Sequence, residues 1–163
     1  MFNYKAKLME TKIKLYKNFF SPIECETILK KCLDKFEIDK RTYAGWYART
    51  NRDINFENYI KEKIEKISPI NPFHIVWINL TEYENNRYLD FHTDERSECT
   101  FTIPLTDGYD GGDFLIEDKK FKLEKGECIS FDGFRLRHGV EPVTKGYRAA
   151  LNIWIKPGRK PIF

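Results

Sequence analysis

From Pro72 onward, apolar and polar residues alternate with a period of two, and this pattern constrains the fold more than any other feature of the chain. Such alternation predicts half-buried β-strands. Turn signals separate most of the strands, among them Glu84-Asn85-Asn86 and Asp110-Gly111-Gly112. About eight short strands at this spacing favour an antiparallel sandwich or barrel, of which the jelly roll is a common form. The predicted strands are 73–80, 87–92, 99–105, 113–117, 120–123, 127–131, 139–143 and 147–155.

Residues 1–70 predict a strand and two helices that support this sheet. Ser21 is a good N-cap, and Pro22 and Glu24 complete the signature of a helix start with a capping box. We expect this first helix to extend to about residue 36, after a strand at 12–19, and a second helix to occupy about 56–67.

No repeat, low-complexity tract or linker divides the chain. We therefore expect a single domain over 1–163, in which 1–70 supports a jelly-roll core at 71–163.

The composition predicts a folded protein without crosslinks. Hydrophobic residues make up 41% of the chain and aromatic residues 15%, which argues against disorder. Twenty-eight basic against 25 acidic side chains leave a net charge of +3, which does not favour a nucleic-acid partner. No apolar run is long enough for a membrane span or a secretory signal, so we expect a cytoplasmic protein that makes no membrane contact and keeps its four cysteines reduced.

The chain has three histidines, and two of them predict a metal site together with one aspartate. His92 and Asp94 form a His-x-Asp motif, and residues i and i+2 of an extended strand point to the same face. Alone, the pair also fits a surface histidine beside a solvated aspartate. His138 follows after enough chain for about four short strands, so an antiparallel sandwich can return it to the same end. Two histidines and a carboxylate form the facial triad of non-haem iron(II) oxygenases, whereas zinc hydrolases more often use three protein ligands and a water.

The last predicted strand places Arg148, Ala150, Asn152 and Trp154 on one face and apolar residues on the other. A planar guanidinium is suited to bidentate capture of a carboxylate inside a pocket. The alternative is an ordinary exposed arginine on a sheet.

The motifs follow one another as His92-x-Asp94, Asp110-Gly-Gly-Asp-Phe-Leu-Ile, Gly126-Glu-Cys-Ile-Ser-Phe, His138-Gly-Val-Glu-Pro-Val-Thr-Lys-Gly-Tyr-Arg148 and Trp154. In this order they resemble the 2-oxoglutarate/Fe(II) dioxygenases, specifically the prolyl 4-hydroxylase-like branch. Asn18-Phe-Phe-Ser-Pro-Ile-Glu-Cys25 and Ala48-Arg49-Thr50-Asn51 extend the resemblance upstream.

The resemblance implies a mainly β fold with N-terminal helices, in the form of a double-stranded β-helix, or cupin-like jelly roll. It implies that His92, Asp94 and His138 bind Fe(II), and that Arg148 pairs with the 5-carboxylate of 2-oxoglutarate in a pocket lined by Tyr83. Dioxygen is the second co-substrate, and ascorbate is the expected reductant.

The implied reaction is hydroxylation of a C–H bond, with a prolyl residue of a peptide or protein as the expected substrate and succinate as the co-product. The nucleic-acid demethylase branch is less similar, because it carries a second arginine where this chain reads Leu151-Asn-Ile-Trp-Ile. A lysyl residue, a free amino acid or another small molecule, and a nucleobase remain open as substrates. A non-catalytic β-sandwich binding module and a zinc or manganese cupin-like hydrolase or isomerase also remain, and the sequence leaves the oligomeric state open.

The segment 41–52 concentrates aromatic residues and arginines between the two predicted helices. One interpretation is a lid that grips an extended substrate through Trp46, Tyr47 and Arg49, of which Arg49 matches the motif of the branch. The other is a strand and loop whose aromatic side chains cover the core.

Overall fold

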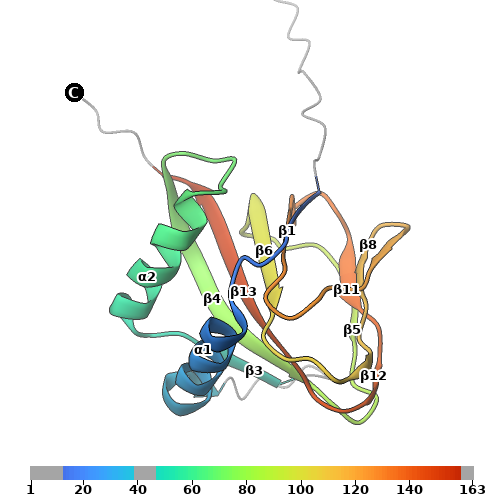
Figure 1. Ribbon diagram of the computed structural model, residues 1–163. Helices are drawn as coiled ribbons and strands as arrows, with labels where there is room; N and C mark the ends of the chain where they lie inside the picture. The colour runs from blue at the N-terminus through green and yellow to red at the C-terminus, as the bar shows by residue number, and fades with distance from the viewer. Residues whose placement is uncertain (1–12, 39–46, 159–163) are drawn as a thin grey trace, which may run out of the picture.

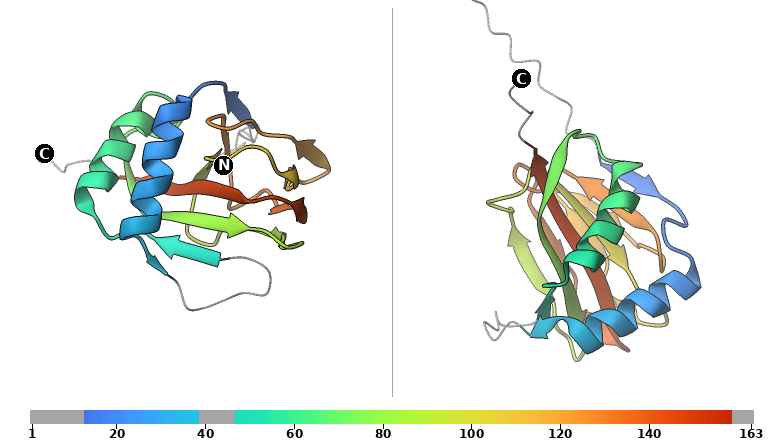
Figure 2. Two further views of the ribbon diagram at one scale, coloured as in Figure 1. Left: turned by 60° about the horizontal axis from the view of Figure 1, so that its bottom comes forward. Right: turned by 90° about the vertical axis from the view of Figure 1, so that its left-hand side faces the viewer.

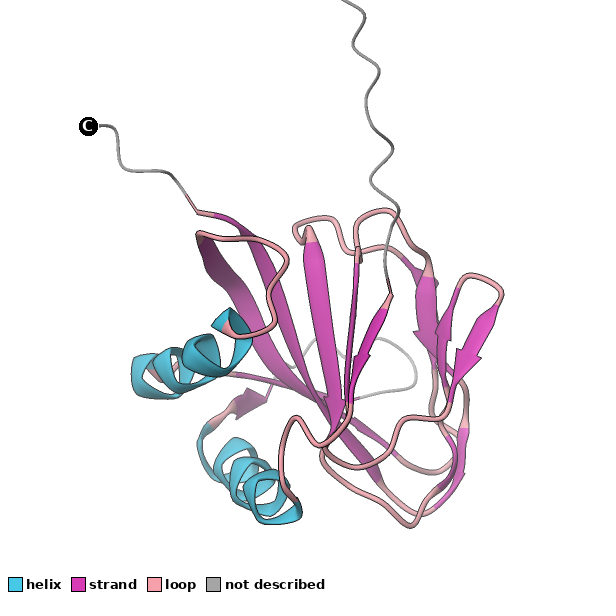
Figure 3. Ribbon diagram, turned by 45° about the horizontal axis from the view of Figure 1, so that its top comes forward, coloured by secondary structure: helices cyan, strands magenta, loops and turns pink. Residues whose placement is uncertain are grey.

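The computed structural model describes residues 13–38 and 47–158, in which antiparallel β-sheets face each other and two helices cover one of them (Figure 1). Both helices lie on the outer face of the larger sheet, and the smaller sheet lies on its other side (Figure 2; Figure 3). The predicted fold class, a mainly β jelly roll with N-terminal helices, is confirmed.

Within residues 13–38 and 47–158, the larger sheet has seven strands. In spatial order they are β1 (Lys14–Tyr16), β10 (Cys128–Phe131), β6 (Cys99–Pro104), β13 (Arg148–Pro157), β4 (Phe73–Tyr83), β3 (Tyr47–Thr50) and β2 (Glu37–Ile38).

In the same part of the chain, the smaller sheet has four strands, and two further strands form a separate ladder. The four are β5 (Leu89–His92), β11 (His138–Val140), β8 (Phe114–Ile116) and β9 (Lys119–Phe121), and the pair is β12 (Val143–Lys145) with β7 (Asp110–Gly111).

Two expectations about the segment 110–143 differ from the structure. The segment predicted as one strand at 139–143 is divided between β11 and β12, and Asp110–Gly111, predicted as a turn, pairs with β12. The physical reason is that the chain passes from the four-stranded sheet, which contains β11, to the two-stranded ladder of β12 and β7, so no single strand spans 139–143.

The helices begin where their caps place them. Ser21 caps α1 (Pro22–Lys35), and the predicted capping box with Glu24 is present in both directions. Helix α2 (Ile54–Glu65) begins two residues before the predicted start, because the side chain of Asp53 accepts a hydrogen bond from the backbone N–H of Asn55. Neither helix in these described residues has the length and apolarity to cross a membrane.

Two apolar clusters hold the layers together. One packs the helices on the larger sheet, and the alternate residues Ala149, Leu151, Ile153 and Ile155 of β13 belong to it. The other lies between the two sheets and includes Tyr83, Phe114, Phe131 and Val140. The residues of β13 that point away from the first cluster therefore face the space between the sheets.

We predict that Gly126→Ala destabilises the fold more than Gly108→Ala does. Both glycines have positive φ, +82° and +72°, so a Cβ costs each about 1–2 kcal/mol of backbone strain. A Cβ at Gly126 would also overlap the carbonyl oxygen of Phe20, whereas nothing lies within 4 Å of one at Gly108. Denaturant unfolding of both variants measures the loss of unfolding free energy. Equal losses in the two variants would show that the backbone at Phe20 moves away from the added Cβ without destabilising the fold.

Candidate active site

The three predicted metal ligands meet where β5 and β11 pair. His138 lies directly opposite His92 in the ladder, and Asp94 follows His92 by two residues. Asp94 Oδ1 is 3.5 Å from His92 Nε2, and Asp94 Oδ2 is 3.3 Å from His138 Nε2. One ligand atom from each side chain lies within 4.8 Å of the others, so the group could hold one metal ion.

Backbone carbonyls orient both imidazoles. Nδ1 of His92 lies 2.8 Å from the carbonyl oxygen of Asp90, and Nδ1 of His138 lies 2.9 Å from that of Leu136. When Nδ1 donates its proton to the carbonyl, Nε2 is left with the lone pair that a metal requires. Both Nε2 atoms are the ones that face Asp94.

The Asp94 carboxylate is held in its charged form. Burial alone raises the pKa of this carboxyl, but interactions with His138, His92 and Thr100 outweigh burial and lower it. The hydroxyl of Thr100 donates to Asp94 Oδ2 at 2.8 Å. Burial lowers the pKa of His92, and the Asp94 carboxylate together with the Asp90 carbonyl more than reverses that effect, so the pKa is raised. An ionised carboxylate is the form in which aspartate binds a metal.

Arg148 is a buried cation without an acidic partner. Arg148 is 1% exposed, and Tyr83 is also buried. The guanidinium carbon of Arg148 lies 5.3 Å from the centroid of the Tyr83 ring. Among the residues that the structure describes, Arg148 forms no ion pair, and its Nε has no hydrogen-bond partner. A buried charge is costly unless it is paired, so this arrangement favours an anionic ligand beside Arg148.

Glycine makes room for this arginine. A Cβ at Gly112 would lie only 2.9 Å from Cδ of Arg148 and 2.9 Å from Cγ2 of Val143. The backbone of the Gly111-Gly112 turn thus packs directly on the arginine side chain.

The two histidines of the cluster, His92 and His138, line one cavity of about 80 Å³ together with the buried Arg148. Its floor is a polar network centred on Asn152, whose amide nitrogen donates to Asn79 Oδ1 and Thr81 Oγ1, both at 3.0 Å. Thr102 donates to the oxygen of the same amide at 2.9 Å. These hydrogen bonds join side chains of β4, β6 and β13 in the part of the cavity between the histidines and Arg148. The remaining lining is largely apolar and includes Leu89, Phe114, Val140 and Trp154.

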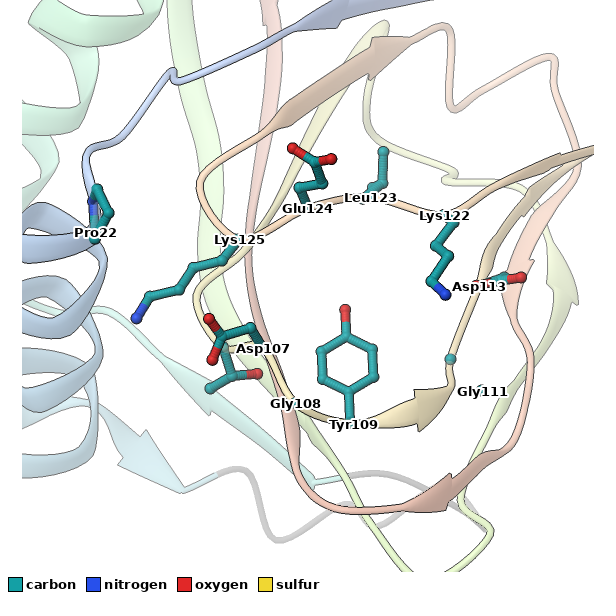
Figure 4. A pocket seen from close by; sticks show the side chains of 12 residues that line it. Pro22, Asp107, Gly108, Tyr109, Gly111, Asp113, Lys122, Leu123, Glu124 and Lys125 are labelled. Carbon is teal, nitrogen blue, oxygen red and sulfur yellow. The ribbon is translucent and has the colours of Figure 1, made fainter.

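A larger cavity, of about 500 Å³, lies outside this site beside the N-terminus of α1 (Figure 4). Tyr109 points into it, and Asp107, Lys122 and Lys125 line it. None of the three clustered side chains borders this cavity. The chemistry of the site therefore belongs to the smaller cavity.

Arg49, one of the residues predicted as substrate contacts, does not join the cluster. Arg49 Nε pairs with Glu82 Oε2 at 2.8 Å, and Glu82 also accepts from the Tyr147 hydroxyl at 2.6 Å. On β3, Ala48 and Thr50 alternate with Arg49, so Arg49 lies on the opposite face of the sheet from Thr50.

Tyr47 begins β3, and Trp46 lies outside the described residues. The segment predicted as a lid therefore includes β3, a strand of the larger sheet that pairs with β4.

Two supporting residues escaped the sequence analysis. Thr100 is a hydrogen-bond donor to Asp94, and Gly133 packs against both of them. The period of β6 could have placed Thr100 on the inner face with Thr102. Gly133 gives no such signal, because its role depends on a steric contact between distant segments.

Comparison with known proteins gives the context of this geometry. The profile of the 2OG-Fe(II) oxygenase superfamily matches residues 78–156, a span that contains all three clustered side chains and Arg148. A PKHD-type hydroxylase of Synechococcus sp. (strain JA-2-3B'a(2-13)) is 30% identical over 164 residues, which cover 82% of this chain and 73% of the relative.

Two solved structures share the fold. A viral collagen prolyl hydroxylase from Paramecium bursaria Chlorella virus-1, in complex with 2OG, has a TM-score of 0.70 at 18% identity over 90% of this chain and 96% of its own. HygX from Streptomyces hygroscopicus, with nickel, 2-oxoglutarate and hygromycin B bound, has a TM-score of 0.72 at 11% identity over 90% of this chain and 83% of its own.

We predict that Gly133→Ala weakens metal binding while the fold persists. Its Cβ would overlap Asp94 Oδ2 and Thr100 Oγ1, so the carboxylate must move. The backbone N–H of Asp94 also donates to the Gly133 carbonyl at 2.8 Å, which ties the two segments together. Anaerobic calorimetric titration with Fe(II), alongside a thermal melt, measures both effects.

Gly158→Ala is the matched control, because a Cβ there makes only ordinary contacts, at 3.4 Å from Pro72. Unchanged Fe(II) affinity in Gly133→Ala would mean that the carboxylate has room to move without loss of the site.

Proposed function

We propose, from the premise that the chain belongs to the 2OG-Fe(II) oxygenase superfamily, that it hydroxylates a prolyl residue in a peptide or protein. The observation that carries the proposal is a His-Asp-His cluster whose two histidines line one cavity together with a buried arginine, for which the described residues supply no acidic partner. In this proposal the whole of 1–163 acts as one dioxygenase domain, with 71–163 as its core.

The residues present fit iron(II) and a dicarboxylate co-substrate. His92, Asp94 and His138 would hold the metal through two nitrogens and one oxygen, a ligand set that leaves coordination positions free. Arg148 would pair with the distal carboxylate of 2-oxoglutarate, and its unpartnered Nε supports this role. Tyr83 would form the wall beneath that carboxylate, since its ring lies against the guanidinium.

When bound, iron(II) and 2-oxoglutarate supply activation of dioxygen, so that one oxygen atom enters a C–H bond and succinate and carbon dioxide leave. The protein supplies orientation and a dry site. The ring of Phe131 packs edge-on against His138, with ring centroids 4.7 Å apart. The ring centroid of Phe114 lies 6.2 Å from that of His138. These rings exclude water and fix the imidazole plane. Ascorbate is the reductant typical of the class.

The prolyl substrate rests on similarity. The Synechococcus relative is named a hydroxylase of the PKHD type, and the viral structure is a collagen prolyl hydroxylase. HygX carries hygromycin B, so the same fold also accepts a small molecule. The Synechococcus hydroxylase is 30% identical to this chain against 11% for HygX, and the match to the viral prolyl hydroxylase covers 96% of that chain against 83% for HygX. These two differences favour a peptide or protein substrate.

Incubation with Fe(II), ascorbate and 2-oxoglutarate under air tests the reaction class. We expect succinate to form, and a prolyl peptide to increase its rate and gain hydroxyproline. Absence of succinate together with absence of metal-dependent 2-oxoglutarate binding would leave the non-catalytic binding module. Turnover that persists without dioxygen would instead favour the cupin-like hydrolase or isomerase.

We predict that His92→Ala and Asp94→Ala each abolish Fe(II) binding and succinate formation, because each removes one of three ligands. The matched control is His74→Ala, since His74 is an exposed histidine of β4 outside the cluster. Metal titration and succinate assays measure the effect. Full activity in either cluster variant would remove the assignment of the metal ligands.

We predict that Arg148→Ala raises the Michaelis constant for 2-oxoglutarate about thirtyfold, the equivalent of about 2 kcal/mol for a lost charge-assisted pair. Fe(II) affinity should stay near the wild-type value. Arg148→Lys should retain part of the binding, because it keeps the charge and loses the bidentate fork. An unchanged Michaelis constant in Arg148→Ala would place the carboxylate partner elsewhere.

A further inference from the structure

One hydroxyl group bonds to the backbone on both sides of Arg148. Oγ1 of Thr106 donates a hydrogen bond to the carbonyl oxygen of Tyr147 at 3.1 Å and accepts one from the backbone N–H of Ala149 at 3.0 Å. A threonine hydroxyl has one donor and two acceptor positions, so it can make both bonds at once. The hydroxyl therefore bridges the residues that precede and follow the buried arginine.

The hydroxyl acts where the regular ladder has ended. The pairing of β13 with β6 ends at Ala150, which lies opposite Pro104, and one further backbone bond runs from the N–H of Leu105 to the carbonyl of Ala149 at 2.8 Å. Ala149 is fully buried, and a buried N–H without a partner is costly. Thr106 supplies the acceptor for this N–H.

A second contact holds the residue before Arg148. The Tyr147 hydroxyl donates to Glu82 Oε1 at 2.6 Å, and Glu82 Oε2 pairs with Arg49. Tyr147 and Ala149 alternate with Arg148 along the chain and pack on the apolar cluster beneath the helices. The neighbours of the arginine are thus held on one face of the sheet, while Arg148 itself lines the cavity on the other.

The Arg148 side chain depends on this backbone for its position. Within residues 13–38 and 47–158 it forms no ion pair and its Nε has no hydrogen-bond partner, so packing against Tyr83 and Gly112 is what holds it. A group that receives a ligand must be held within about 0.5 Å of the productive position. A shift of the backbone at Arg148 would move the guanidinium by more than this tolerance allows.

From this geometry we infer that Thr106 is a positioning residue for the co-substrate. Its hydroxyl fixes the backbone at Arg148, so that the guanidinium is in place before the distal carboxylate of 2-oxoglutarate binds. The inference rests on the proposed function, in which Arg148 binds that carboxylate. Thr106 does not line the cavity of the histidines and Arg148 and borders the larger cavity instead, so it acts through the backbone and makes no contact with the co-substrate.

Thr106→Val tests the inference, because valine keeps the branched shape of threonine and removes the hydroxyl. Anaerobic calorimetry of the Fe(II)-loaded protein measures the dissociation constant for 2-oxoglutarate, and succinate assays measure its Michaelis constant and kcat. We expect both constants to rise about tenfold, the equivalent of about 1.4 kcal/mol. Fe(II) affinity, and kcat at saturating 2-oxoglutarate, should stay near the wild-type values. Thr106→Ser keeps the hydroxyl and should restore 2-oxoglutarate binding.

Thr144→Val is the matched control, because it removes an exposed threonine hydroxyl that donates to the carbonyl of Asp110 at 3.4 Å. It should leave 2-oxoglutarate binding unchanged. The double variant of Thr106→Val with Arg148→Ala separates positioning from a general loss of stability. If Thr106 acts through Arg148, loss of its hydroxyl should not weaken 2-oxoglutarate binding further once the guanidinium is absent.

Three results would overturn the inference: an unchanged dissociation constant in Thr106→Val, an equal loss of Fe(II) affinity, or a full additive effect in the double variant. If Thr106→Val does not fold, Thr106→Cys decides, because a thiol is a weaker donor and acceptor in a side chain of similar size. A raised dissociation constant in Thr106→Cys would support the inference, and the wild-type value would overturn it.

Arg148→Ala alone separates this inference from the proposed function. A raised Michaelis constant for 2-oxoglutarate in Arg148→Ala, together with the wild-type value in Thr106→Val, would remove only the role of Thr106. Wild-type values in both variants would remove the proposed role of Arg148 as well.

Discussion

The pairing of β11 with β5 is the constraint on which the site depends. This register sets His138 opposite His92 and brings two imidazoles, 4.4 Å apart between ring centroids, around the carboxylate of Asp94. A shift of one residue would turn the side chains of either strand to the other face and dissolve the cluster. The apolar cluster between the sheets favours the observed register, since Val140 and Leu89 pack there beside the histidines.

The second requirement is a buried cation that the fold leaves without an acidic neighbour. Most buried arginines are paired, and breaking such a pair is expensive. Arg148 is held instead by the ring of Tyr83 and by the close approach of Gly112, and the described residues offer it no carboxylate. Stability that the apolar core supplies elsewhere offsets this cost. The buried positive charge of Arg148 is instead available to a carboxylate of a bound ligand. This property connects the fold to a reaction that uses 2-oxoglutarate, which is a dicarboxylate.

Sequence alternation predicted the elements that have a strong period. On the last strand it separated Arg148, Asn152 and Trp154 from the core residues between them, and the structure places them so. The His-x-Asp spacing likewise brought His92 and Asp94 to one point. The cap of α1 was predictable because a capping box is local chemistry.

Other features depend on contacts between distant segments, which a single sequence does not encode in a local pattern. Arg49 was expected at the substrate, yet its strand pairing with β4 directs it to Glu82 on the opposite face. Gly133 has ordinary backbone geometry, and its importance arises from the carboxylate of Asp94 that packs on it.

The most direct test of the central claim is an anaerobic crystal structure with Fe(II) and 2-oxoglutarate. We expect one metal ion about 2 Å from Nε2 of His92, from Nε2 of His138 and from a carboxylate oxygen of Asp94, with the distal carboxylate of 2-oxoglutarate on Arg148. A metal ion bound elsewhere, or 2-oxoglutarate bound away from Arg148, would contradict it.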